Sequence, residues 1–133
     1  LNFEVHTLDF NPRKAKFGNK GAHVIGSATR LNEIYPQKFS CIIANGLIGY
    51  GLNDINEFED LLIGASKVLT DEGHLIIGYN NDKNHLSFKL KDAQNFSLFS
   101  EFIPDISGVF MSEVLVNKDN FHTFLFLKKN SRS

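Results

Sequence analysis

Residues 39–54 read FSCIIANGLIGYGLND, and residues 55–69 that follow read INEFEDLLIGASKVL. The opening stretch, 39–44, is apolar and β-prone, which predicts a strand buried on both of its faces. Asp54, followed three residues later by Glu57, forms a capping box, and the apolar residues of 55–69 then recur at helical spacing. A buried strand, a glycine-containing loop and an amphipathic helix in this order predict an α/β fold.

Strand and helix signals continue on both sides of this unit. We expect strands at 3–8, 22–25, 39–44 and 74–79, a weaker helix at 92–102, and a closing antiparallel hairpin of 109–116 and 121–128. This alternation predicts a Rossmann-like three-layer sandwich whose mostly parallel sheet ends in the hairpin. Sheets of this kind bind ligands beyond the carboxyl ends of their strands, so we expect a site in the turns that follow them.

The composition limits the classes of function. The chain has 133 residues, a net charge of -1 and one cysteine, Cys41, which we expect to be a small core residue. One domain, 1–133, fits this length. No positive field favours nucleic acid or an anionic membrane, and no apolar run is long enough for a bilayer. The lack of a secretory signal favours a cytoplasmic location. The five histidines lack metal-ligand spacing, so we expect no metal site.

Asp9 ends the first predicted strand. A carboxylate in this position can accept two hydrogen bonds from the vicinal hydroxyls of a ribose. An aspartate in a turn equally often accepts a hydrogen bond from its own backbone two residues later. From this residue alone both interpretations stay open.

Four segments together carry a family resemblance: VHTLDFNP at 5–12, HVIGSATRL at 23–31, FSCIIANGLIGYGLND at 39–54 and KVLTDEGHLIIGYN at 67–80. They resemble the middle and end of a class I S-adenosylmethionine-dependent methyltransferase. The resemblance implies S-adenosylmethionine as cofactor. It assigns cofactor contacts to residues that follow strands: Asp9 on the ribose, Phe10 on the adenine ring, Ser27 and Ala28 near the adenine amino group, and Asn45 and Gly46 beside the methionine part.

The sequence departs from this family in two places. Ser27 and Ala28 stand where the family often has an acidic residue, and the family's first strand with its glycine-rich loop is missing. We therefore expect 1–133 to be the C-terminal part of a longer domain, with a gap or an unusual pairing in its sheet. An incomplete sheet edge of this kind invites a partner chain or a second copy.

The resemblance implies methyl transfer to an acceptor. Residues 45–48 read NGLI, not the N-P-P-Y of enzymes that methylate nucleic-acid amino groups, which favours a small-molecule acceptor. No catalytic base is identified, although Tyr50 and Tyr79 follow strands and can face the acceptor. We interpret His6, His23, His74 and His122 as structural, since all four fall in strand patterns.

Two other functions remain as alternatives. The missing glycine loop favours a non-catalytic methyltransferase-like module that acts by protein association. The Y-x-x-x-K spacing at 79–83 and the basic residues of 13–20 suggest an NAD(P)-dependent oxidoreductase. We interpret this spacing as coincidence, because the pair works on a helix and Tyr79 ends a strand. The G-x-x-G-x-G at 46–51 reverses the dinucleotide fingerprint. It is interpreted either as a mobile loop that lines the site or as a plain connection that needs positive φ, and we favour the plain connection.

Overall fold

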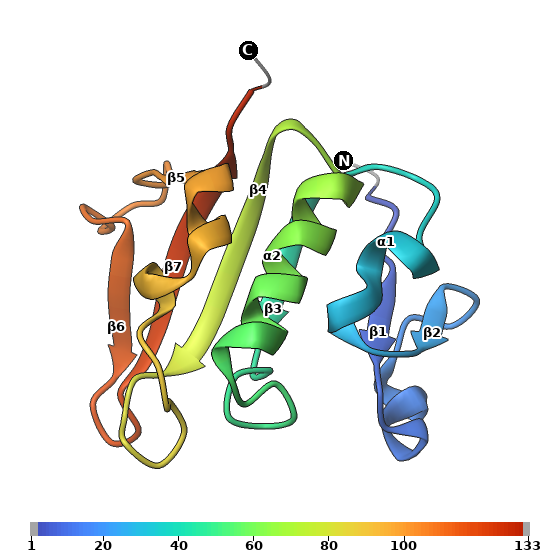
Figure 1. The fold of residues 1–133 in the computed structure, drawn as a ribbon, viewed down its shortest axis with the longest axis horizontal. Coiled ribbons are helices and arrows are strands. Elements are labelled where there is room, and N and C mark those ends of the chain that lie inside the picture. Colours follow the sequence, from blue (N-terminus) through green and yellow to red (C-terminus); the bar gives the residue numbers. More distant parts are fainter. Residues whose placement is uncertain (1–2, 132–133) are drawn as a thin grey trace.

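The computed structural model describes residues 3–131 (Figure 1). None of the helices in this range is long and apolar enough to cross a membrane. With 3-10 helices labelled η, the elements in chain order are β1 (Thr7–Asp9), η1 (Pro12–Phe17), β2 (His23–Ile25), η2 (Ala28–Arg30), α1 (Leu31–Ile34), β3 (Phe39–Asn45), α2 (Ile55–Val68), β4 (Leu69–Asn80), η3 (Leu90–Asp92), η4 (Gln94–Leu98), β5 (Phe99–Glu101), β6 (Glu113–Asn117) and β7 (His122–Lys129).

The strands form two sheets. β1 and β2 pair in parallel as one sheet, and β3 pairs in parallel with β4 in the other. β7 lies antiparallel to β4 and also pairs with β5 and β6, so the predicted closing hairpin is confirmed. The larger sheet is mixed, with three antiparallel pairings against one parallel pairing. The expectation of a mostly parallel sheet was therefore wrong.

A gap separates the two sheets, as the sequence predicts. Within residues 3–131, β1 pairs only with β2, and β3 pairs only with β4 on its inner side. Side chains join the two edges instead. The rings of His6 and Phe39 lie 5.3 Å apart, and Tyr35 packs edge-on against both. Edge-to-face aromatic contacts of this kind thus replace backbone hydrogen bonds between β1 and β3.

Helix α2 forms the core with the larger sheet. Its first turn has the predicted cap, since Asp54 Oδ1 accepts a hydrogen bond from the Glu57 amide at 2.8 Å. The apolar face of the helix is almost fully buried. It packs against the inward-facing side chains of β4 and β7, which include Leu75, Ile77, Leu125 and Leu127.

A second face of α2 receives α1 and η2. Gly64 lies at this contact, and a Cβ added to it would lie 3.2 Å from the Cβ of Leu31. The missing side chain lets α1 approach α2 closely. Because α1 follows directly from the β1–β2 unit, this approach fixes where the smaller sheet sits beside β3 (Figure 1).

Helices α2 and η4 lie on one face of the larger sheet, and α1 lies beside α2 over the smaller sheet. The other face of the larger sheet has no helical layer in the described residues. Ile43 on that face is 68% exposed, and Cys41 beside it is also exposed. The expected three-layer sandwich, the burial of 39–44 on both faces and the core position of Cys41 were therefore wrong. β3 is apolar on both faces, although the face that carries Cys41 and Ile43 is exposed.

Several predicted boundaries also change. Residues 92–102 form 3-10 turns and the short strand β5, because pairing with β7 extends the backbone from Phe99. The strand predicted at 3–8 is reduced to Thr7–Asp9, and the one at 109–116 becomes Glu113–Asn117. β4 begins at Leu69, five residues earlier than expected, and contains an irregularity that skips from the pair Phe39–Leu69 to Cys41–His74.

The buried face of α2 generates a stability prediction. Phe58 has 0% exposure, so Phe58→Ala should lower the free energy of unfolding by about 3–5 kcal/mol, the cost of a large cavity in a packed core. Ile63 on the same helix is 37% exposed, and Ile63→Ala should cost less than about 1 kcal/mol. Urea unfolding followed by circular dichroism measures both variants, and equal losses would contradict this assignment of the core.

Candidate functional site

The turns that follow β1, β2 and β3 lie along one rim. The amide of Gly26 donates a hydrogen bond to the carbonyl of Asp9 at 3.0 Å, which joins the first two turns. The third turn reaches them through its glycine loop. A Cβ added at Gly51 would lie 2.8 Å from the ring of Phe10, so the loop after β3 touches the turn after β1. The structure therefore brings together the three turns that the sequence selects.

Asp9 uses one of its two carboxylate oxygens in its own turn. Oδ1 accepts a hydrogen bond from the Asn11 amide at 2.9 Å. This contact is an Asx turn, one of the two interpretations of Asp9 that stayed open in the sequence analysis. Oδ2 has no hydrogen-bond partner within residues 3–131. Phe10 beside it is 58% exposed and presents its ring at the rim. An exposed apolar ring next to a free carboxylate oxygen can hold a flat base and a hydroxyl group.

Ser27 and Ala28 occupy the start of η2. The Ser27 hydroxyl accepts a hydrogen bond from the Thr29 amide at 3.2 Å and lies 2.7 Å from the Thr29 hydroxyl. It therefore serves as the N-cap of this turn. Ala28 is the first residue of η2 and is half-buried. These two residues shape the rim, and the Ser27 hydroxyl already accepts a hydrogen bond from the backbone of η2.

Asn45 ends β3 and its side chain crosses the neighbouring strand. Its Oδ1 lies 3.0 Å from Nε2 of His122, although His122 belongs to β7 and β4 runs between them. The crossing passes over Gly78, where an added Cβ would overlap Asn45 Oδ1 and lie 2.7 Å from Phe124. A glycine inside a strand marks a close approach of this type. Gly78 is thus the residue that permits the Asn45–His122 contact.

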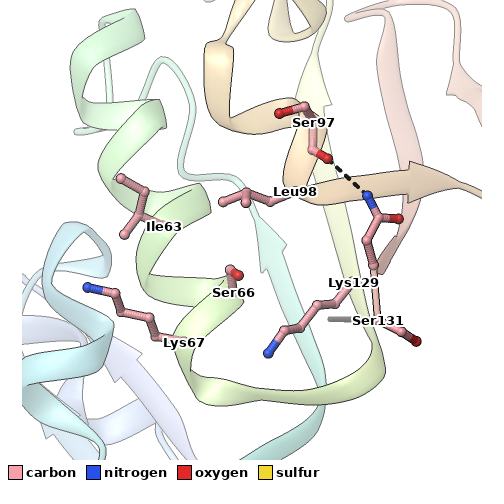
Figure 2. Close-up of a pocket in the computed structure, with 8 residues that line it drawn as sticks. Ile63, Ser66, Lys67, Ser97, Leu98, Lys129 and Ser131 are labelled. Atoms are coloured by element: carbon pink, nitrogen blue, oxygen red, sulfur yellow. Dashed lines mark hydrogen bonds between the residues drawn. The ribbon is translucent and has the colours of Figure 1, made fainter. Parts of the chain in front are cut away.

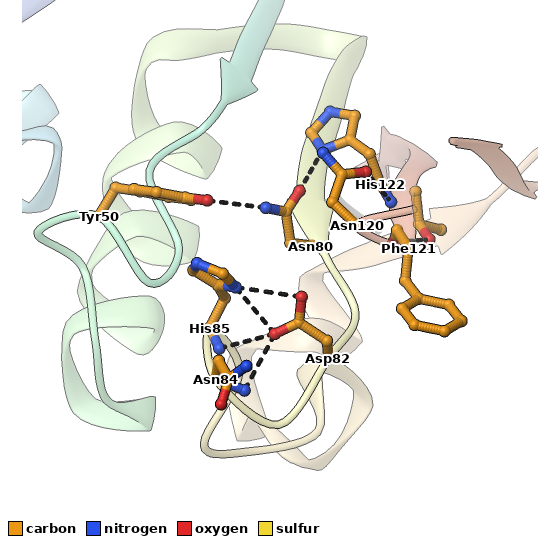
Figure 3. A network of polar contacts seen from close by, with 9 residues as sticks. Tyr50, Asn80, Asp82, Asn84, His85, Asn120, Phe121 and His122 are labelled. Atoms are coloured by element: carbon orange, nitrogen blue, oxygen red, sulfur yellow. Dashed lines mark hydrogen bonds and ion pairs between the residues drawn. The ribbon is translucent and has the colours of Figure 1, made fainter. Parts of the chain in front are cut away.

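Figure 3 shows that the contact continues into a chain of polar groups. Nδ1 of His122 lies 2.6 Å from Oδ1 of Asn80, and Nδ2 of Asn80 donates to the Tyr50 hydroxyl at 2.8 Å. Tyr50 in turn stacks on the ring of His85, with the centroids 5.0 Å apart. Three segments far apart in the sequence, 45–50, 80–85 and the start of β7, therefore meet at the carboxyl end of β4.

The backbone at this rim explains the glycine cluster. Gly46, Gly49 and Gly51 have φ values of 74°, 85° and 127°. These values lie in the left-handed region that side chains disfavour, so the interpretation of the cluster as a loop needing positive φ is confirmed. Turning the chain sharply here places Tyr50 over the end of β4.

Tyr79 lies away from this site. Its hydroxyl donates to Glu113 at 2.7 Å on the helix-covered side of the sheet. Burial and this carboxylate raise the pKa of Tyr79 far above its usual value. Lys83 follows in a turn, so Tyr79 and Lys83 do not share a helix face. The Y-x-x-x-K spacing is coincidence, and of the two tyrosines singled out in the sequence only Tyr50 reaches the rim.

One residue of this rim escaped the sequence analysis: His122 was interpreted as a structural strand residue. The signal that points to it is Gly78, an isolated glycine in the apolar run HLIIGY at 74–79. A glycine inside a strand indicates that another group approaches the backbone closely there.

A hollow of about 480 Å³ lies at the other end of the sheet from the rim (Figure 2). It runs between the last turns of α2 and the end of β7, and Lys67 and Lys129 line it. The Lys129 ammonium is almost fully buried, donates to the carbonyl of Leu69 at 3.0 Å and lies 3.9 Å from Asp71. These contacts occupy Lys129 in joining β7 to the start of β4.

Comparison with known proteins places the fold. No protein-family model and no curated protein sequence matches the chain. Among solved structures, the N-methyltransferase NodS from Bradyrhizobium japonicum WM9 superposes with a TM-score of 0.67 at 15% identity, over 94% of this chain and 73% of NodS. NodS in complex with S-adenosyl-L-homocysteine gives 0.65 at 13% identity, over 94% of this chain and 66% of that one.

A nucleic-acid enzyme also resembles the chain. A putative rRNA methylase from Clostridium thermocellum superposes with a TM-score of 0.63 at 10% identity, over 95% of this chain and 72% of that protein. These matches cover most of the present chain, so it has the fold of class I S-adenosylmethionine-dependent methyltransferases. The resemblance inferred from the sequence is confirmed at the level of the fold.

The crossing over Gly78 can be tested by a double-mutant cycle. Gly78→Ala should lower the free energy of unfolding by about 1–3 kcal/mol, because the added methyl group overlaps Asn45 and Phe124. In an Asn45→Ala background part of this clash is absent, so the same substitution should cost less by about 0.5 kcal/mol or more. Chemical denaturation of the four proteins gives the coupling energy, and strict additivity would show that Asn45 does not cross at Gly78.

Proposed function

We propose that this chain is part of an S-adenosylmethionine-dependent methyltransferase that acts on a small molecule. The observation that carries the proposal is the rim, where the turns after β1, β2 and β3 meet on a class I methyltransferase fold. The neighbouring NodS structure holds S-adenosyl-L-homocysteine, which supports a related cofactor here.

The residues at the rim fit an adenosyl group in part. Asp9 offers Oδ2 to the ribose hydroxyls while Oδ1 keeps the turn in shape. Phe10 offers an exposed ring to the adenine, and the backbone at Gly46 is open because nothing lies within 4 Å of an added Cβ. Ser27 and Ala28 support the rim by shape, since the Ser27 hydroxyl caps η2.

When bound, the cofactor supplies a methyl group on a sulfonium that is already a good leaving group. The protein then has to hold the methyl donor and the acceptor in line and in contact. Asp9 and Phe10 fix the nucleoside at one end of the rim. Asn45 and the loop from Gly46 to Gly51 border the other end, where the reacting groups would meet.

A small acceptor agrees with the charge and the loop chemistry. The net charge of -1 provides no broad attraction for a phosphate backbone. The loop that begins at Asn45 continues with Gly46, Leu47 and Ile48, in place of the N-P-P-Y type that nucleic-acid amino-methylating enzymes carry. A small molecule, a sugar or a lipid precursor therefore fits this chain better as methyl acceptor than a nucleic acid does.

Isothermal titration with S-adenosyl-L-homocysteine tests the cofactor assignment. The protein, extended upstream where its gene encodes more, should bind the nucleoside, and Asp9→Ala should weaken binding by about 1–3 kcal/mol because a charged hydrogen bond is lost. Asp9→Asn is the matched control, since an amide oxygen preserves the Asx turn without the charge. No heat of binding in the extended protein would remove the catalytic proposal, and unchanged affinity in Asp9→Ala would remove Asp9 from the site.

A second candidate function is association through a sheet edge. Within the described residues the outer edge of β3 has no strand partner, and Ile43 next to it is exposed. An unpaired edge of this kind can take up a strand from another chain. A methyltransferase-like module that acts in this way needs no cofactor.

Light scattering separates the two candidates. A module acting through its edge should give a mass above one chain, and a charge at the exposed position, Ile43→Lys, should return it to a monomer. Leu98→Lys, on the helix-bearing side of the sheet, is the control and should leave the mass unchanged. A monomer at every concentration, with nucleoside binding intact, would leave only the enzymatic candidate.

A further inference from the structure

The charges of the chain are unevenly distributed. The net charge of -1 predicts no attraction to an anionic surface. Residues 10–32 nevertheless contain no aspartate or glutamate and five basic residues: Arg13, Lys14, Lys16, Lys20 and Arg30. The rest of the chain holds nine basic and fifteen acidic residues. The connections of the smaller sheet therefore form a positive region in an otherwise acidic protein.

Four of these five cations have no ion-pair partner in the part of the chain that the structure describes. They are the basic residues of 13–20, and all four are exposed. Arg30 is the exception, since its guanidinium pairs with Glu33 at 2.5 Å. An exposed cluster of one sign, not neutralised within the protein, attracts a partner of the opposite charge.

An exposed aromatic ring lies among these cations. Phe17, the last residue of η1, is 74% exposed. The ammonium groups of Lys14 and Lys16 lie over its ring, 5.7 and 5.2 Å from the centroid. Charge and apolar area are therefore presented together at the end of η1.

A second apolar side chain belongs to the same surface. A Cβ added at Gly18 would overlap the His23 ring, so η1 ends against the face of β2 that carries His23. Ile25 lies on this face too, because side chains two apart in a strand point the same way, and it is 54% exposed. We call this region the η1 surface, and it consists of Arg13, Lys14, Lys16, Phe17, Lys20 and Ile25.

The η1 surface borders the rim. The Asn11 side chain caps η1 by accepting a hydrogen bond from the Arg13 amide at 3.0 Å, and the Asn11 amide donates to Asp9. Figure 1 shows η1 projecting beyond β1 and β2 at the end of the molecule where β4 finishes. A partner held by the η1 surface therefore lies next to the turn that carries Asp9.

We propose that the η1 surface docks on a membrane that contains anionic lipids. The lysine and arginine side chains lie among the lipid phosphates, while Phe17 and Ile25 enter the boundary of the acyl chains. Lysine side chains are long enough to reach the headgroups when an apolar neighbour is inserted between them. The contact is peripheral, at the surface of the bilayer.

Single-stranded nucleic acid fits this surface less well. Proteins bind it with cations and with aromatic rings on which the bases stack. The Phe17 ring already has two ammonium groups over it, so a base stacks there only if a lysine leaves. Ile25 has no ring to offer, whereas acyl chains accept an aliphatic side chain as readily as an aromatic one.

The docking also bears on the methyl acceptor, and this part rests on the proposed function. A rim held at the headgroups meets molecules that reside in the bilayer. Of the acceptors that fit the chain, a lipid precursor is then the one that reaches the rim most readily.

Vesicle binding tests the role of charge. The full chain should sediment with vesicles of phosphatidylcholine and phosphatidylserine, about two to one, and not with phosphatidylcholine alone. Replacing two lysines together, Lys14→Gln and Lys16→Gln, should weaken binding about 25-fold, at about fivefold for each lysine near the surface. The control pair Lys67→Gln and Lys118→Gln removes the same charge from the end of α2 and from the turn between β6 and β7, and should leave binding unchanged.

Fluorescence tests the insertion of the ring. The chain has no tryptophan, so Phe17→Trp introduces a single reporter. Its emission should move to shorter wavelength when the anionic vesicles are added, because the ring leaves water. Phe110 is 81% exposed in the loop between β5 and β6, so Phe110→Trp is the control and should show no shift. Phe17→Ala should weaken vesicle binding about tenfold, the scale for removing an apolar ring from water.

Five results would overturn the docking. They are no binding to the anionic vesicles, equal losses in the two lysine pairs, an emission shift in Phe110→Trp in place of Phe17→Trp, full binding by Phe17→Ala, and binding of a single-stranded oligouridylate in place of vesicles. None of these measurements contains S-adenosylmethionine, so any of them leaves the proposed methyl transfer standing. No heat in the calorimetric titration would overturn the methyl transfer and leave the docking.

Discussion

Helix α2 is the element that both sheets share. One face of the helix buries Phe58, Leu61 and Leu62 against β4 and β7, and another receives α1 at Gly64. β1 and β3 exchange no backbone hydrogen bonds in the described residues. The two contacts of α2 therefore hold the smaller sheet in place beside the larger one. The burial of the apolar helix face fixes where the strands lie, and the turns that form the rim follow those strands.

The polar chemistry of the rim depends on an absent side chain. Gly78 lets Asn45 lie across β4 and reach His122, so groups from two strands that are not neighbours meet over the one between them. Sheets ordinarily bring together residues of adjacent strands. Here the crossing gives the site a contact that pairing alone cannot provide, and it places neutral amides on both nitrogens of an imidazole.

The sequence predicts the elements whose signals are local and strong. The N-cap at Asp54 and the spacing of α2 are reproduced, as are the closing hairpin and the turns that hold Asp9 and Asn45. The return half of the predicted capping box is displaced by one residue, because Glu57 accepts from the Asn53 amide. The prediction fails for 92–102, where pairing with β7 overrides a helical pattern. It also fails for Ile43, because the sequence of an apolar strand is the same whether its second face is covered or exposed. His122 was missed since its partners lie 42 and 77 residues away.

The aromatic bridge of His6, Tyr35 and Phe39 has a mechanical consequence. Rings that pack edge to face can slide by a fraction of an ångström without breaking a hydrogen bond, whereas a strand ladder cannot. β1 and β3 are therefore held side by side by ring packing and not by a strand ladder. The span from Asp9 to Asn45 thus depends on how these three rings pack, whereas the spacing of paired strands is fixed by their hydrogen bonds.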